Sequence, residues 1–438
     1  MTELTEDAKR IFLRTLRAIE PDSVIKQKLR VDDDTLEFGD EQIPLEGVRE
    51  VVLIGMGKAS LKMGAAVETL LGDRIKRGIL VTDRRSYISV RSQVIVAGHP
   101  LPDANSLIAG EKIRGVVRSC GHDALIIFLI SGGGSSLVEL PLTEAITLED
   151  LRVTNQVLIG CGATIRETNI VRKSLSLIKG GRLGRLARKS KCVGLYQSDV
   201  NPGDLRSIAS NPLLPEEFES EALFDVVNRF DLMEKLPGSV VSAIRDKHLS
   251  PFVDSWNSAE SEPLTMLLLD NSNAIQAAAE IARQHGFHVE VCSDLIEGDY
   301  RAVADRLVDR LLSLRSSFPN EPVCVISGGE VTCSVRRVGI GGRNQEFVLY
   351  SAARLASLGI RGDAVVLSCG TDGIDGNSKA AGAVADAELV SNAARHGADA
   401  TIFISNNDSH SFFKKSGGLV VTGPSGNNVR DLRFLMAQ

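Results

Sequence analysis

The sequence is poor in the features that nucleic-acid-binding and membrane-spanning proteins require. Only 4% of its 438 residues are aromatic, and its net charge is −6, so neither base stacking nor attraction to a phosphate backbone is favoured. No apolar run approaches the ~20 residues that a membrane-spanning helix needs. We therefore expect no nucleic-acid partner and no membrane partner.

The seven cysteines form neither a disulfide framework nor a metal-binding pattern. They are scattered, mostly within apolar runs such as "PVCVIS", and no two have CxxC spacing. An odd number of cysteines favours a reducing compartment, and no Cys/His spacing fits a zinc site. The first 21 residues form an amphipathic helix pattern and not a basic segment followed by an apolar stretch. These features favour a cytoplasmic protein.

The sequence is rich in short apolar runs that alternate with helical patterns. Runs such as "REVVLIG", "RGILVTD", "DALIIFLIS" and "DAVVLSC" are continuously apolar, which is typical of parallel strands covered on both faces. Strand–helix alternation of this kind predicts an α/β fold. The pattern changes after residue 212, where an acidic helical stretch with prolines resembles a connector. We predict two α/β lobes, an N-terminal Rossmann-like parallel-sheet sandwich over residues 1–240 and a C-terminal α/β domain over residues 241–438.

Glycine-rich polar loops follow several predicted strands, the position at which open α/β sheets bind ligands. The segment "GMGKAS" places Gly55, Gly57 and Lys58 at a strand-to-helix turn. One interpretation is a dinucleotide fingerprint with Asp83 as the ribose-binding acid, although Ser60 stands where a third glycine is expected. A second is a lysine that holds an anion at a helix N-terminus, and a third is a tight turn with a solvated lysine.

Further loops of the N-terminal half combine backbone and cationic donors for anions. The segment "SGGGSS" can form a nest of backbone N–H groups for phosphate or a merely flexible turn, and it contains Ser131, Gly132, Gly133, Gly134, Ser135 and Ser136. Arg172 and Lys179 flank a glycine-broken helix and suit phosphoryl oxygens or a solvated helix face. Asp199 at the next strand end suits Mg²⁺ or an Asx turn.

The C-terminal half adds a second set of loops. An arginine at a helix start, as in "GGRNQE", can stabilise the charge on a transferring phosphoryl group. Two aspartates in "GTDGIDG" suit a metal ion or a proton, or only a tight turn. The candidates here are Gly328, Glu330, Arg343, Asn344, Gln345, Glu346, Asp372, Asp375, Asn407 and Asp408. Anion donors and acids at so many strand ends predict phosphoryl transfer.

The same motifs, in this order, resemble the class II glycerate 2-kinases, whose C-terminal part is the MOFRL domain and some of which were labelled hydroxypyruvate reductases. The matching segments run through most of the chain, from "GMGKAS" and "GHPLPD" to "GTDGIDG" and "TGPSGNNVRDL". The resemblance implies a kinase that transfers the γ-phosphoryl group of ATP to the 2-hydroxyl of D-glycerate, or of a related small sugar acid, with Mg²⁺. It also implies an active cleft between two α/β domains, with the MOFRL region at about residues 320–430.

The resemblance places Lys58 and Arg343 at the positions of the family's catalytic lysine and arginine. We expect Lys58 to hold the substrate carboxylate and Arg343 the phosphoryl oxygens, with Asp199 as the base and Asp372 and Asp375 as metal ligands. The chain departs from the family pattern at Ser174, Asn211 and Leu213, where a histidine, a glycine and a hydroxyl residue are usual.

The expected partners are ATP and a D-glycerate-like acid, bound by a monomer or a homodimer. One alternative is an NAD(P)H-dependent hydroxypyruvate reductase that uses the Gly57 turn, with Asp83 and with His99 as proton donor. Another is a nucleotide sensor without catalysis.

Overall fold

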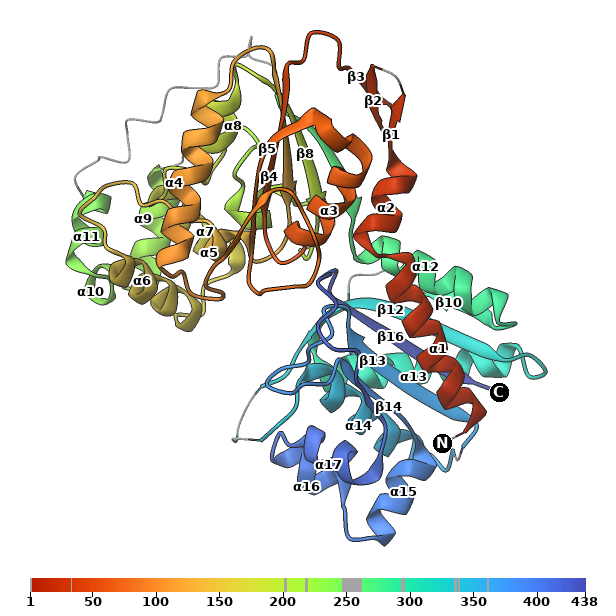
Figure 1. Cartoon of the computed structure of the whole chain (residues 1–438). Helices are drawn as coiled ribbons and strands as arrows, with labels where there is room; N and C mark the ends of the chain where they lie inside the picture. The colour runs from red at the N-terminus through yellow and green to blue at the C-terminus, as the bar shows by residue number, and fades with distance from the viewer. Residues whose placement is uncertain are drawn as a thin grey trace. The chain divides into compact units, whose positions relative to one another are not determined.

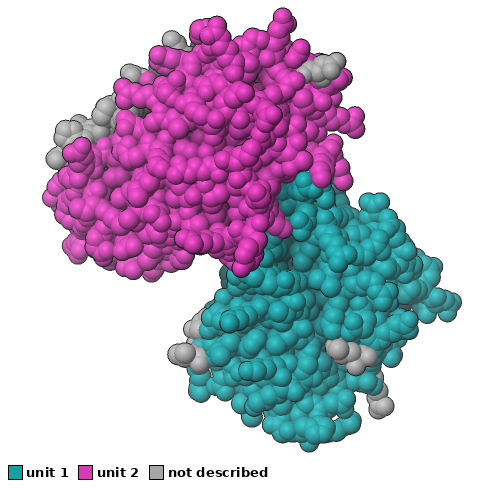
Figure 2. Space-filling view, viewed as in Figure 1, with its two compact units in different colours: residues 1–23, 269–438 teal, residues 24–268 magenta. Residues whose placement is uncertain are grey.

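The chain forms two compact units, unit 1 from residues 1–23 and 269–438 and unit 2 from residues 24–268 (Figure 2). The computed structural model describes residues 2–32, 34–200, 203–216, 220–245, 262–292, 296–334, 337, 339–360 and 362–438. The domain boundary that we expected at residue 240 differs from that of the compact units, which lies between residues 268 and 269. The first helix, α1 (Glu3–Ala18), packs on strands of the C-terminal half, because the ring of Phe12 lies edge-on to that of Phe434, with centroids 6.4 Å apart.

Unit 2 is built on a six-stranded sheet with the order β6-β5-β4-β7-β8-β9. Strands β4, β5 and β8 of this sheet are labelled in Figure 1. All the registered pairs from β6 to β8 are parallel, as the continuous apolar runs predicted, and every residue of β7 is buried. The order reverses direction between β4 and β7, as in doubly wound folds. The strands are β4 (Glu50–Met56), β5 (Ile75–Thr82), β6 (Gln93–Val96), β7 (Ala124–Ile130), β8 (Lys191–Gln197) and β9 (Leu264–Leu269).

Helices cover this sheet and add a separate helical layer. The sheet packs against α3 (Ser60–Leu71), α4 (Ala104–Ser119), α5 (Gly134–Leu137) and α8 (Arg182–Ala187). The helical layer consists of α6 (Leu148–Gly160), α7 (Ile165–Ser174), α9 (Ser220–Arg229), α10 (Leu232–Lys235) and α11 (Gly238–Arg245). The stretch that we expected to connect the lobes is thus part of unit 2, because Leu223, Val227 and Leu232 are buried against Leu158 and Val171. A short helix, α2 (Pro21–Lys28), precedes an antiparallel sheet of β1 (Leu29–Asp32), β2 (Thr35–Phe38) and β3 (Glu41–Pro44).

Unit 1 contains a second, mixed sheet with the order β10-β12-β16-β13-β14-β15 and β11 beside β12. Strands β10 and β11 run parallel to β12, but every other pair is antiparallel. The central strand β16 was not expected, because Asp431 and Arg433 interrupt its apolar sequence "DLRFLMA". The strands are β10 (His288–Val291), β11 (Glu297–Asp299), β12 (Val323–Thr332), β13 (Ala364–Gly370), β14 (Gly382–Asp386), β15 (Leu419–Val420) and β16 (Asp431–Ala437).

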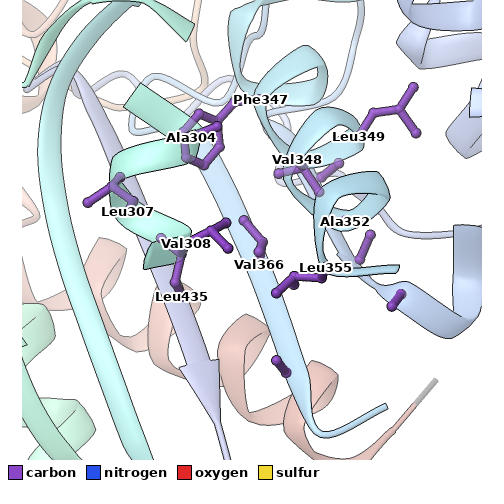
Figure 3. Close-up of a cluster of buried hydrophobic side chains, with 14 of the residues drawn as sticks. Ala304, Leu307, Val308, Phe347, Val348, Leu349, Ala352, Leu355, Val366 and Leu435 are labelled. Carbon is purple, nitrogen blue, oxygen red and sulfur yellow. The ribbon is translucent and has the colours of Figure 1, made fainter. Parts of the chain in front are cut away.

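Helices lie on both faces of the second sheet. On one face, α13 (Tyr300–Ser317) and α14 (Arg343–Ser357) bury Leu307, Phe347 and Leu355 against Val366 and Leu435 of the strands (Figure 3). Side chains alternate along a strand, so Phe434 faces the other side, which α1 and α12 (Asn271–Gln284) cover. Three short helices complete the unit, α15 (Ala387–Arg395), α16 (Ala400–Ser405) and α17 (Ser409–Ser416). Within the described residues, no helix combines the length and apolarity that crossing a membrane requires.

Candidate functional site

Two loops of unit 2 are bonded together where the strand order reverses, at the carboxyl ends of β4 and β7. The backbone N–H of Lys58 donates to the carbonyl of Gly132 at 3.0 Å, and the N–H of Ala59 donates to the hydroxyl of Ser131 at 3.1 Å. Gly57 makes this approach possible, because a Cβ at that position would stand 2.2 Å from Ser131 Oγ and its φ is +126°. The glycine turn therefore serves to join the loops.

Three chemically active side chains surround the glycines of the second loop. A Cβ built on Gly132 would lie 1.8 Å from Asp199 Oδ2, so the carboxylate is directly against this glycine. A Cβ on Gly133 would lie 3.0 Å from His99 Cδ2 and 3.3 Å from Lys58 Cγ. Gly133 is left-handed, with φ +83°, and precedes the first turn of α5. The structure thus brings Lys58, His99 and Asp199 together around the predicted anion nest.

Charged groups of both signs lie around this nest, with Lys58 and the carboxylate of Asp199 against its glycines. Partial desolvation and the positive charge of Lys58 lower the pKa of His99 to about 4, so its ring is neutral at pH 7. Burial opposes ionisation of Asp83, but the pKa of its carboxyl is still lowered because Arg84 bonds to it, with Arg84 Nη2 2.7 Å from Asp83 Oδ2. Asp83 is therefore engaged by a cation and is a poor match for the ribose-binding acid of a dinucleotide site.

The serines of the nest are fixed by a chain of hydrogen bonds. Ser210 donates to the side-chain oxygen of Asn169 at 2.8 Å, so Ser135, 2.8 Å away, donates to Ser210. Ser136 donates to the carbonyl of Gly133 at 3.2 Å. The segment Ala209–Asn211 that carries Ser210 has φ values of +50°, +57° and +53°, a strained run typical of functional sites.

The departures from the family pattern fall on interior positions. Asn211 takes a left-handed conformation, which asparagine tolerates better than most residues and for which glycine is the usual choice. Ser174 is buried and donates to the carbonyl of Val171 at 2.7 Å, and Leu213 is fully buried. At these positions the side chains therefore have structural surroundings within unit 2.

The two predicted cations of the helical segment differ in their surroundings, because Lys179 is neutralised in the interior while Arg172 bonds to a neutral amide. The side chain of Lys179 is 2% exposed, and its ammonium group is paired with the buried carboxylate of Glu139. Arg172 Nε donates to Asn155 Oδ1 at 2.8 Å. Our expectation of a phosphate ligand at Lys179 thus conflicts with its burial, which assigns it to the interior of unit 2.

In unit 1, Arg343 begins α14 and is held by two acids. Its Nε and Nη2 atoms donate to Asp431 Oδ2 and Oδ1 at 2.7 and 3.0 Å, and its Nη1 atom lies 2.8 Å from Glu330 Oε1. Burial disfavours the charge of Arg343, but the two carboxylates outweigh it and raise its pKa above the ordinary value. Arg343 is thus a permanent cation with a fixed orientation.

The residues that follow Arg343 point inward. The backbone and side-chain N–H groups of Asn344 and Gln345 donate to the two oxygens of Asp375, at 2.8 to 3.2 Å. Glu346 is buried and accepts from the hydroxyl of Tyr300 at 3.4 Å. Asn344, Gln345 and Glu346 are therefore unsuited to the ligand role that we expected. Asp375 accepts these bonds at the N-terminus of α14, which disfavours but does not test its predicted role as a metal ligand.

The remaining predicted residues have local roles. The carbonyl of Gly328 accepts from Arg433 at 2.7 Å, and Asn407 donates to the carbonyl of Ser334 at 3.3 Å. Asp408 accepts the N–H of Ile340 at 3.1 Å. Asp372 is half-buried and accepts the N–H of Ile374 at 3.0 Å. Within the described part of the chain, no three metal-binding side chains form a cluster.

Sequence reasoning missed Asp431 and considered His99 as a reductase proton donor or as a structural cap beside Pro100. For Asp431 the one available signal was its charge at the start of an apolar run, "DLRFLMA". For His99 it was the position of "GHPLPD" directly after a predicted strand.

Comparisons with known proteins cover almost the whole chain. A family model described as a domain of unknown function, DUF4147, matches residues 7–245, and the MOFRL family model matches residues 323–431. The chain is 33% identical over 431 residues to the D-glycerate 2-kinase of Thermotoga maritima, covering 96% of this chain and 95% of that protein. It is also 37% identical over 394 residues to an Agrobacterium vitis protein with a provisional hydroxypyruvate reductase name, covering 88% and 86%. The crystal structure of glycerate kinase from Thermotoga maritima matches with a TM-score of 0.84 and 30% identity over 99% of both chains.

Proposed function

This chain belongs to the family that carries the DUF4147 and MOFRL domains and includes the glycerate kinases, and on that premise we propose that it phosphorylates the 2-hydroxyl of D-glycerate with ATP to give 2-phosphoglycerate. A closely related small sugar acid is the other acceptor compatible with the site. The observation that supports the proposal best is the position of Lys58 beside Gly133 and His99, where backbone amides and a cation can hold an anion. The hydroxypyruvate reductase alternative is not favoured, because Asp83 is paired with Arg84.

The glycine nest is the proposed site for the phosphates of a nucleotide. Gly132 and Gly133 let the Asp199 carboxylate and the His99 ring lie directly against the loop, where an added side chain would collide with them. We propose that the amides of this loop and the hydroxyls of Ser135 and Ser136 bind phosphate oxygens. Lys58 then neutralises the carboxylate of the acceptor or the charge of the phosphates.

Proton transfer and the cation need carboxylates. We propose Asp199 as the group that accepts the proton of the acceptor hydroxyl, since it lies against the nest. Mg²⁺ binds few carboxylates together with phosphates and water, so the absence of an acidic cluster in the described residues does not conflict with it. Asp372 is the carboxylate of the 370–376 loop that we retain for Mg²⁺, which when bound would neutralise phosphate charge. Arg343 in unit 1 is the proposed donor to the transferring phosphoryl group.

The test is release of ADP from ATP and Mg²⁺, measured chromatographically with D-glycerate, L-glycerate and three- and four-carbon relatives as acceptors. We expect turnover with D-glycerate and a product whose ³¹P and ¹³C NMR spectra show phosphate on C2. Lys58→Ala and Arg343→Ala should each lower kcat at least ~100-fold, the typical effect of removing a group that stabilises transition-state charge. Their circular dichroism should match that of the parent protein.

Three results would overturn the proposal. Phosphate on C3 would contradict the position of transfer. Oxidation of NADH with hydroxypyruvate would restore the reductase. ATP binding without ADP release for any acceptor would favour a nucleotide sensor.

A further inference from the structure

The two acids that hold Arg343 differ in exposure. The side chain of Asp431 is 0% exposed, that of Glu330 is 42% exposed, and that of Arg343 is 34% exposed. Asp431 bonds to the Nε–H and one Nη2–H of the guanidinium, the side-on fork arrangement of arginine and carboxylate. A fork of this kind fixes the plane of the guanidinium and not only its position.

Asp431 is itself held rigidly. It is the first residue of the central strand β16 and lies opposite Gly329 of β12 and Gly370 of β13, neither of which has a side chain to compete for the space. Arg433 Nη2 lies 3.3 Å from Asp431 Oδ2, while Arg433 Nη1 donates to the carbonyl of Gly328. Burial alone would favour the protonated acid, but Arg343 and Arg433 keep the pKa of Asp431 below its ordinary value. Asp431 therefore stays ionised. Because its side chain is 0% exposed, it cannot contact a substrate directly.

The hydrogen-bond count shows which part of Arg343 remains for a ligand. A guanidinium has five N–H groups. Among the described residues, Asp431 accepts two of them at 2.7 and 3.0 Å, and Nη1 lies 2.8 Å from Oε1 of the exposed Glu330 as an ion pair. The part of the guanidinium not used by the buried acid is the one that the exposed acid reaches. An incoming anion can compete with Glu330 there but not with Asp431.

We propose that Asp431 is the positioning residue of Arg343 and sets the plane of the guanidinium, so that Nη1 and the second Nη2–H face a substrate anion. Glu330 occupies part of that edge of the guanidinium until the anion replaces it. The inference rests on the proposed function in one respect, namely that Arg343 is the arginine which stabilises the transferring phosphoryl group. The positioning itself is a property of unit 1 and can be measured without turnover.

The first experiment follows the Nε–H of Arg343 by NMR, with the resonance assigned through its disappearance in Arg343→Lys. We expect a downfield, slowly exchanging signal in the parent protein. In Asp431→Asn, which keeps the shape but removes the charge, the signal should move upfield and exchange at least ~10-fold faster, since the charge-assisted bond is lost. The signal should persist in Glu330→Gln. An unchanged resonance in Asp431→Asn would overturn the inference, whether or not the protein is a kinase.

The second experiment measures steady-state kinetics with ATP and D-glycerate. Asp431→Asn should lower kcat ~100-fold with the KM values changed less than ~3-fold, the effect of a misplaced group acting in the transition state. The matched control is Asp386→Asn, which makes the same change at another buried aspartate of unit 1, the N-cap of α15, and leaves the Arg343–Asp431 fork intact. It should keep both the Nε–H signal and kcat within ~5-fold. Equal loss of kcat in the two variants would show a merely structural role and overturn the inference.

If Asp431→Asn fails to fold, a second variant still tests whether Arg343 needs a fixed guanidinium plane. Arg343→Lys keeps the charge but cannot form the fork, so it should lose kcat to a similar extent, ~100-fold. A lysine variant within ~5-fold of the parent kcat would contradict the need for a fixed guanidinium plane. If the parent protein shows no kinase activity, the proposed function fails, while the NMR result still decides the role of Asp431.

Discussion

The carboxylate of Asp199 lies directly against the Cα of Gly132, since a Cβ built on that glycine would stand 1.8 Å from Asp199 Oδ2. Real Cβ atoms do not approach other atoms so closely, so one of the two residues must move if any side chain is added. The pair joins the loop after β7 to the residue that follows β8. It therefore relates the predicted phosphate nest to the proposed base.

Gly132→Ala should remove activity with a modest effect on stability. The added methyl group displaces Asp199 or the nest, and a misplacement of about 1 Å can cost ~100-fold in rate. We expect kcat to fall by about that factor, while the free energy of unfolding falls by roughly 1–3 kcal/mol because of overpacking. ADP release and urea unfolding measure the two effects.

Gly115→Ala is the control for that substitution. Gly115 is exposed on α4, and among the described residues no atom lies within 4 Å of a Cβ built there. The change should leave kcat unaltered and stabilise the helix by up to about 1 kcal/mol. Parent-like turnover in Gly132→Ala would contradict the role of the Asp199–Gly132 contact.

Lys179→Met should act on stability and not on substrate binding. It leaves Glu139 buried without its cation, and breaking a buried pair in this way typically costs about 3–5 kcal/mol. Lys173→Met is the matched change on the same segment, at a half-buried lysine that pairs with Glu216 at 2.6 Å, and should cost about 1 kcal/mol or less. Urea unfolding compares the two. A Lys179→Met protein with parent-like stability and a raised KM for ATP would restore the phosphate-ligand interpretation.

The sequence predicted those structural features that depend on residues close together in the chain. The parallel strands β4, β5, β7 and β8 of unit 2 were predicted, because a largely buried parallel strand is a continuous apolar run. Strand β9 was expected in the C-terminal lobe, and β1 to β3 were not expected. The glycine loops were predictable as well, because a close approach such as that of Gly57 to Ser131 requires glycine. Both signals are local in the sequence.

Burial of polar residues was not predictable in the same way. Asn344 and Gln345 are polar letters in a glycine-rich loop, yet their partner is Asp375, about 30 positions later. Strand β16 was missed because Asp431 and Arg433 neutralise each other in the interior, so its charges resemble those of a surface segment. In each case the compensating group is distant in the sequence, and only the fold brings it near.

Substitution of the two aspartates of the 370–376 loop should have different effects, on stability for Asp375 and on Mg²⁺ dependence for Asp372. Asp375→Asn replaces an acceptor of four N–H groups by an amide that can repel some of them, so we expect a loss of about 1–3 kcal/mol in the free energy of unfolding. Its apparent affinity for Mg²⁺ should not change. Asp372→Asn should do the reverse, with near-parent stability and Mg²⁺ dependence shifted to at least ~10-fold higher concentration. Titration of activity with Mg²⁺ and urea unfolding check both variants. A shifted Mg²⁺ requirement in Asp375→Asn would restore it as a metal ligand.

Glu346 should make the stability of the protein depend on pH. Its side chain is 2% exposed, and burial raises its pKa to about 7, although hydrogen bonding by Ser409 and then by the Tyr300 hydroxyl partly offsets this. A glutamate in the unfolded chain titrates near 4.3. Between these values the unfolded chain releases the proton first, so this residue makes the fold less stable as pH rises from about 4.5 to 7. Above pH 7 the full loss is present.

Glu346→Gln removes that dependence, because glutamine has nearly the same shape and does not titrate. Relative to the parent protein, the variant should gain stability as pH rises, from about zero at pH 4.5 to on the order of 3–4 kcal/mol at pH 8. Urea unfolding of both proteins at half-unit pH steps measures the difference. Glu280→Gln, at an exposed position of α12, shows the effect of losing one carboxyl at the surface. Both curves include every other titrating group of the chain, so only Glu346 can produce a difference in unfolding free energy that grows between pH 4.5 and 7. Parallel curves would contradict the prediction, because they would show that the carboxyl of Glu346 ionises at the same pH in the folded and unfolded chain.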